Sequence, residues 1–410
     1  MGAETESEQQ PQRRRGSRLK KRLLFLLYLL VVSGVLVELG MRVLSRDVRG
    51  RTSFANTLLL PLDPLTEQQE AALKMDERTL TYVVPDARLG WTVKPSGASG
   101  DGLYRSNRLG LRALREVSED RAPGVRRTLI VGDSFAHGDE VAFEDTWFAQ
   151  LEQLSEGQDE YWCGGVPGYG TDQAILRLDD LIPPLKPDRV VLTIYRMNLV
   201  RNLTFFRVIQ SPKTGIPMSK PRFLRGPDGA LTVENSPTLT PAQIPEALRN
   251  YGKHRLGRRD DLYDATLYED RFAYLSRVYC YLHSRRAMAE FMARQNELVR
   301  PGGLGFDWGL RLGEEFGRRM KVLGIEPVIV LLPDHADLEG LERKEPSPMA
   351  ALAEALRARG LRVVNTEDAV LAALAAGEAP TSLFVGGTGH PNPRCSQVLA
   401  THLHEALRQP

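Results

Sequence analysis

Short apolar runs bounded by turn residues dominate the chain from about residue 126 onward. Five of them have the length of buried strands, and the segments between or after them have the 3.6-residue periodicity of helices. The runs are RRTLIVGDS, YWCGGVPG, PDRVVLTIY, EPVIVLLP and LRVVNTED, and the helical segments include AILRLDDLI, FGRRMKVLG and PMAALAEALRARG. This alternation predicts an α/β fold in three layers, α/β/α, with a central parallel sheet. Ligands bind beyond the carboxyl ends of such strands, so we expect the chemistry there.

A different pattern marks the N-terminus. Seven basic residues between Arg13 and Arg22 precede an uncharged apolar run from Leu23 to Val37, and extension to Met41 adds one acid, Glu38. We expect a basic cytoplasmic tail over 1–22 and a single transmembrane anchor over 23–41, with the remainder outside the cytoplasm. A cleaved signal peptide is the alternative, but the segment VELGMRVL has no A-x-A-like cleavage site.

The rest of the chain divides by pattern. Residues 42–125 are mixed in character and form an N-terminal extension, and residues 126–408 form the α/β domain. A long excursion over 203–300 interrupts this domain between the third and fourth predicted strands. It contains Pro-Asp-Gly between two extended runs, which predicts a hairpin, and we expect the excursion to form a subdomain over the site.

Composition narrows the possible functions. The chain has 410 residues, 42% apolar and 26% charged, and a net charge of +2, which is ordinary for a globular protein and offers no field to attract nucleic acid. Its three cysteines cannot build a disulfide framework, and the accessible one is predicted to be Cys395. No Cys/His spacing resembles a zinc site, and PDHAD at 333–337 is the one cluster of potential ligands, so we expect neither metal nor cofactor.

Polar residues and glycines follow the predicted strands. Ser134 comes after the first in Gly-Asp-Ser-Phe, Gly165 after the second, and Asn198 after the third, while His390 lies near the C-terminus in GTGHPNP. A serine, two further hydrogen-bond donors and a histidine are the parts of an acyl-transfer site, apart from the acid.

The order of these four blocks resembles that of the GDSL-type hydrolases of the SGNH superfamily. IVGDSF resembles the serine block, GGVPGYGTDQ the glycine block, MNLVRN the asparagine block and GHPNP the histidine block, and YRSNRLGLR at 104–112 resembles a segment of membrane-anchored bacterial members. The resemblance implies a flavodoxin-like fold, Ser134 as nucleophile and His390 as base. It also implies an oxyanion hole formed by the N–H groups of Ser134 and Gly165 and the side chain of Asn198.

The chain departs from this pattern at the catalytic acid. Where the family has an aspartate two or three residues before the histidine, this sequence has Thr388 and Gly387. Three interpretations stay open: Thr388 or a backbone carbonyl orients His390, Glu367 or Asp368 reaches it, or the site binds without efficient turnover. The only rival base is His137, three residues beyond Ser134.

From these features we expect a membrane-anchored, extracytoplasmic ester hydrolase or O-acyltransferase. The resemblance to anchored family members implies O-acylated glycans or other envelope esters as substrates. The competing hypothesis is a catalytically weak or inactive acyl- or glycan-binding protein with the same cleft. The sequence does not identify a protein partner.

Overall fold

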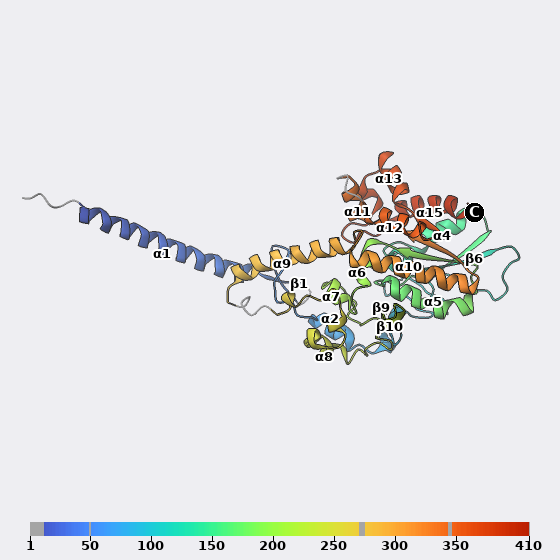
Figure 1. The fold of residues 1–410 in the computed structure, drawn as a ribbon, viewed down its shortest axis with the longest axis horizontal. Coiled ribbons are helices and arrows are strands. Elements are labelled where there is room, and N and C mark those ends of the chain that lie inside the picture. Colours follow the sequence, from blue (N-terminus) through green and yellow to red (C-terminus); the bar gives the residue numbers. More distant parts are fainter. Residues whose placement is uncertain (1–11, 49–50, 270–274, 343–346, 410) are drawn as a thin grey trace, which may run out of the picture. The chain divides into compact units, whose positions relative to one another are not determined.

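The computed structural model describes residues 12–48, 51–269, 275–342 and 347–409 (Figure 1). It divides into two compact units. The N-terminal unit comprises the described residues up to Asp63 together with Ala265–Glu290, and the main unit comprises Pro64–Asp264 and Phe291–Pro410.

A five-stranded parallel sheet forms the centre of the main unit. Its order is β12-β11-β8-β6-β7, and the five strands are the five runs that the sequence predicts. Their bounds are β6 Arg126–Val131, β7 Asp159–Cys163, β8 Arg189–Ile194, β11 Glu326–Leu331 and β12 Val363–Asn365. In chain order this is the 2-1-3-4-5 arrangement of flavodoxin-like folds, so the predicted fold class is confirmed. The first two strands of this sheet in chain order, β6 and β7, are parallel neighbours, so their carboxyl ends lie beside each other.

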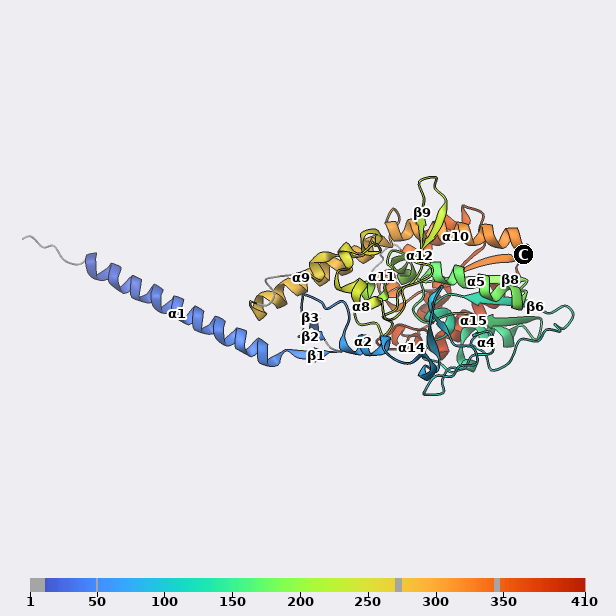
Figure 2. The ribbon, with the colours of Figure 1, turned by 90° about the horizontal axis from the view of Figure 1, so that it is seen from below.

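Helices cover both faces of this sheet. One layer contains α5 (Thr171–Leu185), α10 (Leu304–Leu323) and α12 (Pro348–Arg357), and the other contains α4 (Trp147–Leu154), α13 (Glu367–Ala375) and α15 (Pro393–Arg408) (Figure 2). Glycines at every fourth position let α10 pack closely. A Cβ atom on Gly309 or Gly313 would come within 2.6 Å of a leucine side chain of the neighbouring elements.

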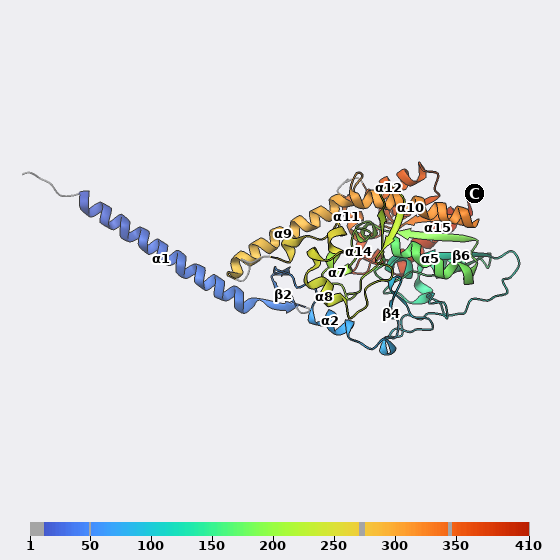
Figure 3. The ribbon, with the colours of Figure 1, turned by 60° about the horizontal axis from the view of Figure 1, so that its bottom comes forward.

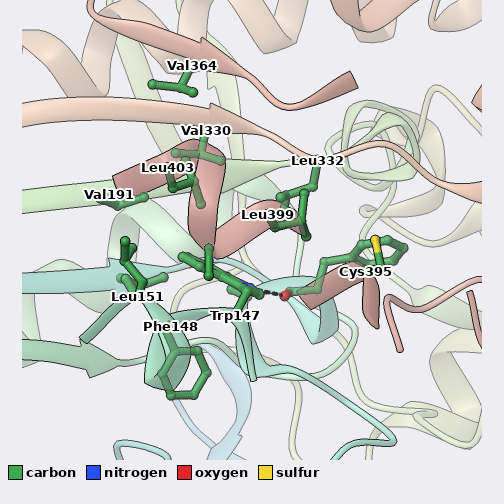
Figure 4. Close-up of a cluster of buried hydrophobic side chains, with 14 of the residues drawn as sticks. Trp147, Phe148, Leu151, Val191, Val330, Leu332, Val364, Cys395, Leu399 and Leu403 are labelled. Carbon is green, nitrogen blue, oxygen red and sulfur yellow. Dashed lines mark hydrogen bonds between the residues drawn. The ribbon is translucent and has the colours of Figure 1, made fainter. Parts of the chain in front are cut away.

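The core between the sheet and the layer of α4, α13 and α15 holds in place the turn after β6, which carries Ser134. Trp147 and Phe148 of α4 pack with Leu399 and Leu403 of α15 under the strands (Figure 4). The indole Nε1 of Trp147 donates a hydrogen bond of 3.0 Å to the carbonyl of Phe135, the residue after Ser134 (Figure 4). The apolar core is thus bonded directly to the loop that carries the predicted nucleophile.

The excursion over 203–300 does not stay in one unit. The predicted hairpin is present as β9 (Arg222–Arg225) and β10 (Leu231–Glu234), and residues up to Asp264 belong to the main unit, whereas Ala265–Glu290 belong to the N-terminal unit. Arg222 joins the hairpin to the main unit, because its buried guanidinium donates to the carbonyls of Asn202 and Arg259, both at 2.7 Å. The single subdomain that the sequence suggested is therefore divided.

Shorter elements complete the main unit (Figure 3). They are α2 Glu67–Leu73, β4 Val83–Asp86, β5 Gly90–Val93, α3 Ser134–His137, α6 Arg196–Arg201, α7 Arg207–Gln210, α8 Ile244–Arg249, α11 His335–Glu342 and α14 Pro380–Leu383, with 3₁₀ turns at Glu77–Thr79, Phe143–Asp145, Tyr251–Lys253 and Gly257–Arg259.

The N-terminal unit contains one long apolar helix. In α1 (Gln12–Leu44), the stretch Arg18–Leu44 is long and apolar enough to cross a membrane. Glu38 on this helix accepts hydrogen bonds from the backbone N–H groups of Arg277 and Val278, at 2.7 and 3.1 Å, and so caps α9 (Arg277–Leu298). The unit also holds β1 Arg46–Val48, β2 Arg51–Phe54, β3 Thr57–Leu58 and the turn Ala265–Leu267.

Candidate active site

Ser134 follows the carboxyl end of β6, between β8 and β7 in the sheet, as the first residue of the single-turn helix α3. The chain must turn sharply there, and Gly132 permits the turn because a Cβ atom on it would lie 1.9 Å from the hydroxyl of Thr193 on β8. Asp133 caps the turn by accepting a 3.0 Å hydrogen bond from the N–H of Phe135. Ser134 is therefore presented at the sheet edge where a parallel α/β fold binds ligands.

His390 meets this serine from a loop more than 250 residues later in the chain. Its Nε2 lies 2.9 Å from the Ser134 Oγ, within the range of a hydrogen bond. The Phe135 ring lies edge-on to the imidazole, with 5.1 Å between centroids, and stacks on Tyr195 at 4.2 Å. The structure thus brings together the two residues that the sequence nominated as nucleophile and base.

The carboxylate beside His390 belongs to Glu140, which the sequence analysis missed. Its Oε2 lies 3.0 Å from the His390 Nδ1, on the opposite side of the ring from Ser134. Thr388, which the sequence suggested as an orienting residue, donates its hydroxyl to the same oxygen at 2.5 Å. Glu140 has a φ of 70°, in the left-handed region that non-glycine residues rarely adopt, and such strain is common at functional sites.

The loop that carries Glu140 is fixed by residues of the N-terminal extension. Arg112 is buried, and its guanidinium donates to the carbonyls of His137, Gly138 and Val141, the first and last at 2.6 Å. The Tyr104 hydroxyl accepts a 2.8 Å hydrogen bond from the N–H of Glu140 itself. Both residues belong to YRSNRLGLR, so this segment positions the acid through the loop 137–141.

His137 belongs to a second hydrogen-bonded chain, next to the first. Its Nε2 lies 2.6 Å from the Tyr82 hydroxyl and its Nδ1 lies 2.5 Å from Asp139. The side chain is completely buried, and burial lowers the pKa of His137, so the ring stays neutral. Because both ring nitrogens are engaged with Tyr82 and Asp139, His137 is not placed as a base for Ser134.

Asn198 lies on α6, after β8, and its side-chain amide is bonded to Asp133 instead of facing an open position. Its amide nitrogen donates to Asp133 Oδ2 at 3.1 Å and to the Tyr169 carbonyl at 3.0 Å, and its oxygen accepts from the N–H of Tyr195 at 2.7 Å. Arg201 donates to the same two acceptors, Asp133 at 2.6 Å and Tyr169 at 3.0 Å. An oxyanion role for Asn198 would require one of these amide hydrogens to be released.

Gly165 packs behind the serine turn. A Cβ atom on it would lie 2.6 Å from the backbone nitrogen of His137 and 2.8 Å from the Ala136 side chain, so only glycine fits against α3. Burial raises the pKa of the neighbouring Cys163 thiol to about 12, and that thiol donates to the Ala136 carbonyl at 3.2 Å.

The carboxylates after β12 have other partners. Glu367 accepts hydrogen bonds from the Ser347 hydroxyl at 2.5 Å and from the Asn365 amide at 3.1 Å, and burial raises its pKa. Asp368 is exposed on the first turn of α13. Glu140, and neither of these residues, is the carboxylate within hydrogen-bond distance of His390.

Two further expectations concern cysteine and metal. Cys395 is fully buried, against the prediction of an accessible thiol, because α15 turns it into the core with Leu399, and burial raises its pKa to about 12. Within the described ranges, no three histidine, cysteine or acidic side chains are grouped as metal ligands would be.

A cavity of about 380 Å³ adjoins the histidine loop. It lies between Asp334 and His335, which follow β11, and the loop 384–389 that leads to His390. Thr388, the hydrogen-bond partner of Glu140, is part of its wall. This hollow offers room for a group bound beside the Ser134–His390 pair.

Fold and site together define a flavodoxin-like α/β protein with a hydrogen-bonded serine, histidine and carboxylate at the strand ends.

No family model matches the chain, and no curated protein matches it in sequence. Solved structures similar to it include a lipolytic protein of the G-D-S-L family from Desulfitobacterium hafniense DCB-2, at 11% identity and a TM-score of 0.35, covering 68% of this chain and 98% of that one. A second is a member of the same family from Veillonella parvula DSM 2008, at 12% identity and a TM-score of 0.34, covering 70% and 100%. A third is Axe2, an acetylxylan esterase from Geobacillus stearothermophilus, at 12% identity and a TM-score of 0.37, covering 70% and 95%. At such identities and TM-scores, no function is carried over from these proteins to this chain.

Proposed function

We propose that this protein is a serine ester hydrolase whose catalytic triad is Ser134, His390 and Glu140. The observation that carries the proposal is the continuous chain of hydrogen bonds from the Ser134 hydroxyl through both nitrogens of His390 to the Glu140 carboxylate. This is the arrangement by which a weak hydroxyl nucleophile is activated and the imidazolium is stabilised. It supplies the acid that the histidine block lacks.

In the proposed mechanism, His390 Nδ1–H donates to Glu140, which leaves Nε2 as the acceptor for the Ser134 hydroxyl proton. The Ser134 Oγ attacks the ester carbonyl while Nε2 takes this proton, and His390 then returns it to the leaving alcohol. Water, activated by the same nitrogen, releases the acyl group from Ser134. Glu140 fixes the tautomer throughout and stabilises the positive ring.

The oxyanion that forms in this reaction needs preorganised donors. We propose the Ser134 N–H as one and the Gly165 N–H as another, with the side chain of Asn198 contributing only if its present hydrogen bonds exchange when substrate binds. As the structure stands, Asn198 supports the site through Asp133. Loss of one true oxyanion donor lowers turnover by a factor of about 10² to 10³, which gives the effect expected of Asn198→Ala if the exchange occurs.

The substrate would occupy the cavity beside the 384–389 loop. Its polar residues and its position outside the strand ends suit a small acyl group on a polar alcohol, such as an O-acylated glycan or another envelope ester. Transfer of the acyl group to a second alcohol uses the same covalent step, so O-acyltransfer is the variant of this proposal in which an acceptor replaces water.

A decisive test is labelling and turnover with the purified chain. Wild type should hydrolyse short-chain aryl esters and should react at Ser134 with an active-serine phosphonate probe. Both signals should vanish in Ser134→Ala, and His390→Ala should abolish turnover without unfolding the protein. If wild type is not labelled and hydrolyses no ester but still binds ligands, the protein is better described as an acyl- or glycan-binding protein.

We further propose that α1 is an uncleaved membrane anchor with the main unit outside the cytoplasm. Glu38 supports retention of the helix, because its carboxylate caps α9 and so ties α1 to folded chain. A reporter that works only outside the cytoplasm should be active when fused after Pro410, and the full-length chain should resist extraction from membranes by high salt. A soluble product lacking α1 would contradict the anchor.

A further inference from the structure

One guanidinium close to the proposed triad lacks the partners that the other buried arginines have. The Nη1 of Arg207 donates to the side-chain oxygen of Gln210 at 3.2 Å, while its Nε is inaccessible to solvent and has no hydrogen-bond partner. Among the described residues, no carboxylate lies within ion-pair distance of Arg207. In the part of the chain that the structure describes, its Nη2 has no hydrogen-bond partner either, and unlike Nε it is not buried, so this end of the guanidinium is open to solvent.

The other arginines of the main unit make the contrast clear. Arg112 donates to three backbone carbonyls, Arg189 to Glu326 and to a carbonyl, and Arg222 to two carbonyls and to Asp261. Arg112, Arg177 and Arg201 also leave Nε without a partner, but each donates through its Nη atoms to at least two acceptors. A partly buried guanidinium with a single neutral acceptor is therefore exceptional in this fold.

Arg207 lies beside the loop that follows β7. A Cβ atom on Gly168 would be 3.6 Å from the Arg207 Nε, and Gly168 has a φ of +84°. The next residue, Tyr169, offers its carbonyl to Asn198 and Arg201, which also hold the Asp133 side chain next to Ser134. The Arg207 guanidinium thus lies against the loop after β7, and the same loop contacts the side chains that hold Asp133.

The nearby negative charge is already used. Asp133 accepts from Arg201 at 2.6 Å, and Arg196 lies 3.5 Å from Asp337. Burial and the charge of Arg201 lower the pKa of Arg207 to about 9, so it still carries a positive charge at neutral pH. Asp133 is therefore paired with Arg201, and an added anion would balance the charge of Arg207.

We propose that Arg207 forms an anion-binding subsite, so that the preferred substrates are esters carrying a carboxylate or phosphate group. A guanidinium can bind either group by charge-assisted hydrogen bonds, and here they would come from the Nη atoms, because Nε is inaccessible to solvent. The inference rests on the proposed hydrolase function and narrows its substrate class.

The experiment uses the full-length chain and three acetyl esters that differ in charge: phenyl acetate, 4-acetoxybenzoate and 4-acetoxyphenyl phosphate. Wild type should have a kcat/KM at least about 10-fold higher for one of the two anionic esters than for phenyl acetate, mainly through KM, as a hydrogen-bonded charge pair permits. The better anionic ester distinguishes carboxylate from phosphate. Arg207→Gln should abolish this preference, and Arg207→Lys should retain part of it.

Controls separate this inference from the proposed function. Arg286→Gln, which removes an exposed arginine of the N-terminal unit, should leave the ratio between anionic and neutral esters unchanged. If no ester is turned over, equilibrium binding of 4-hydroxybenzoate and of inorganic phosphate to Ser134→Ala, with and without Arg207→Gln, still tests the subsite. Equal turnover of all three esters by wild type, or an anion preference that survives Arg207→Gln, would overturn the proposal.

Discussion

Two hydroxyl–histidine–carboxylate chains both include residues of the segment 134–140, yet only one of their histidines is open to solvent. The first joins Ser134, His390 and Glu140 at 2.9 and 3.0 Å, and the second joins Tyr82, His137 and Asp139 at 2.6 and 2.5 Å. The side chain of His390 is 16% exposed and that of Glu140 is 34% exposed, whereas His137 has no exposure at all.

The difference teaches that hydrogen-bond geometry alone does not define a catalytic site. In the buried chain, loss of solvation raises the pKa of Tyr82 and lowers that of His137, so the phenol keeps its proton and the imidazole stays neutral. The open chain can receive a substrate and exchange protons with water. The buried chain instead braces the loop whose far end carries Glu140.

The largest expected effect separates the two histidines. His390→Ala should lower ester turnover by a factor of roughly 10⁴ or more, because it removes the base, while the thermal unfolding midpoint stays near that of wild type. His137→Ala should instead destabilise the fold by about 2–4 kcal/mol, since it leaves two buried partners unpaired. Chemical denaturation and ester kinetics on both variants test this. A stable, inactive His137→Ala with a fully active His390→Ala would reverse the assignment.

Removal of the acid tests whether Glu140 completes the open chain. Glu140→Gln should reduce turnover by a factor of about 10² to 10⁴, because the amide neither stabilises the imidazolium nor enforces the tautomer. The matched control is Glu144→Gln, four residues further along, which should retain activity. Wild-type kinetics in Glu140→Gln would exclude Glu140 from the triad.

A smaller effect is expected at the position where the histidine block lacks its aspartate. Thr388→Asp places a second carboxylate against Glu140, with which the Thr388 hydroxyl now shares a 2.5 Å hydrogen bond. Repulsion between the two carboxylates should move Glu140 from His390 and lower turnover by about 10-fold. In the Glu140→Gly background, the same Thr388→Asp change should raise turnover. Wild type, the two single variants and the double variant form one double-mutant cycle, measured by kcat. An increase in the wild-type background would contradict this arrangement.

The smallest expected effect concerns pH and the buried chain. Burial holds the pKa of His137 in the folded protein below its unfolded value near 6.5, although Asp139 opposes the shift. The unfolded chain therefore binds a proton more readily, so this contribution to stability is present above about pH 6.5 and is lost as the pH falls. Wild type should lose more stability between pH 7.5 and pH 5 than His137→Gln does, in denaturant titrations at each pH. An identical pH dependence for both proteins would count against a neutral buried ring.

The fold could be predicted from the sequence because it depends on local patterns. Each of the five apolar runs is a strand, and the helical segments cover the sheet, since burial of both faces leaves a continuous apolar signature in every strand. Ser134 and His390 were nominated because the order of the four motif blocks resembles that of a known family. Ser134 directly follows β6, as the parallel topology predicts, whereas His390 lies in the loop after α14 and reaches Ser134 only in the folded chain.

Contacts that depend on side-chain paths across the fold could not be predicted in this way. Glu140 stands six residues after Ser134 with nothing in its local sequence to relate it to a histidine 250 positions later. The sequence also nominated Gly165 and Asn198 as donors, but the packing of Gly165 against α3 and the hydrogen bonds of Asn198 to Asp133 and Tyr169 are set by the fold.

The sequence by itself therefore determined the α/β class, the apolar N-terminal helix and the serine–histidine pair, because periodicity and strand order are properties of the chain. The tertiary structure decided which carboxylate serves His390, which histidine is sealed from water and which arginine is left without an acid. These depend on burial and on distances between segments remote in sequence, and such distances are fixed only when the whole core is packed.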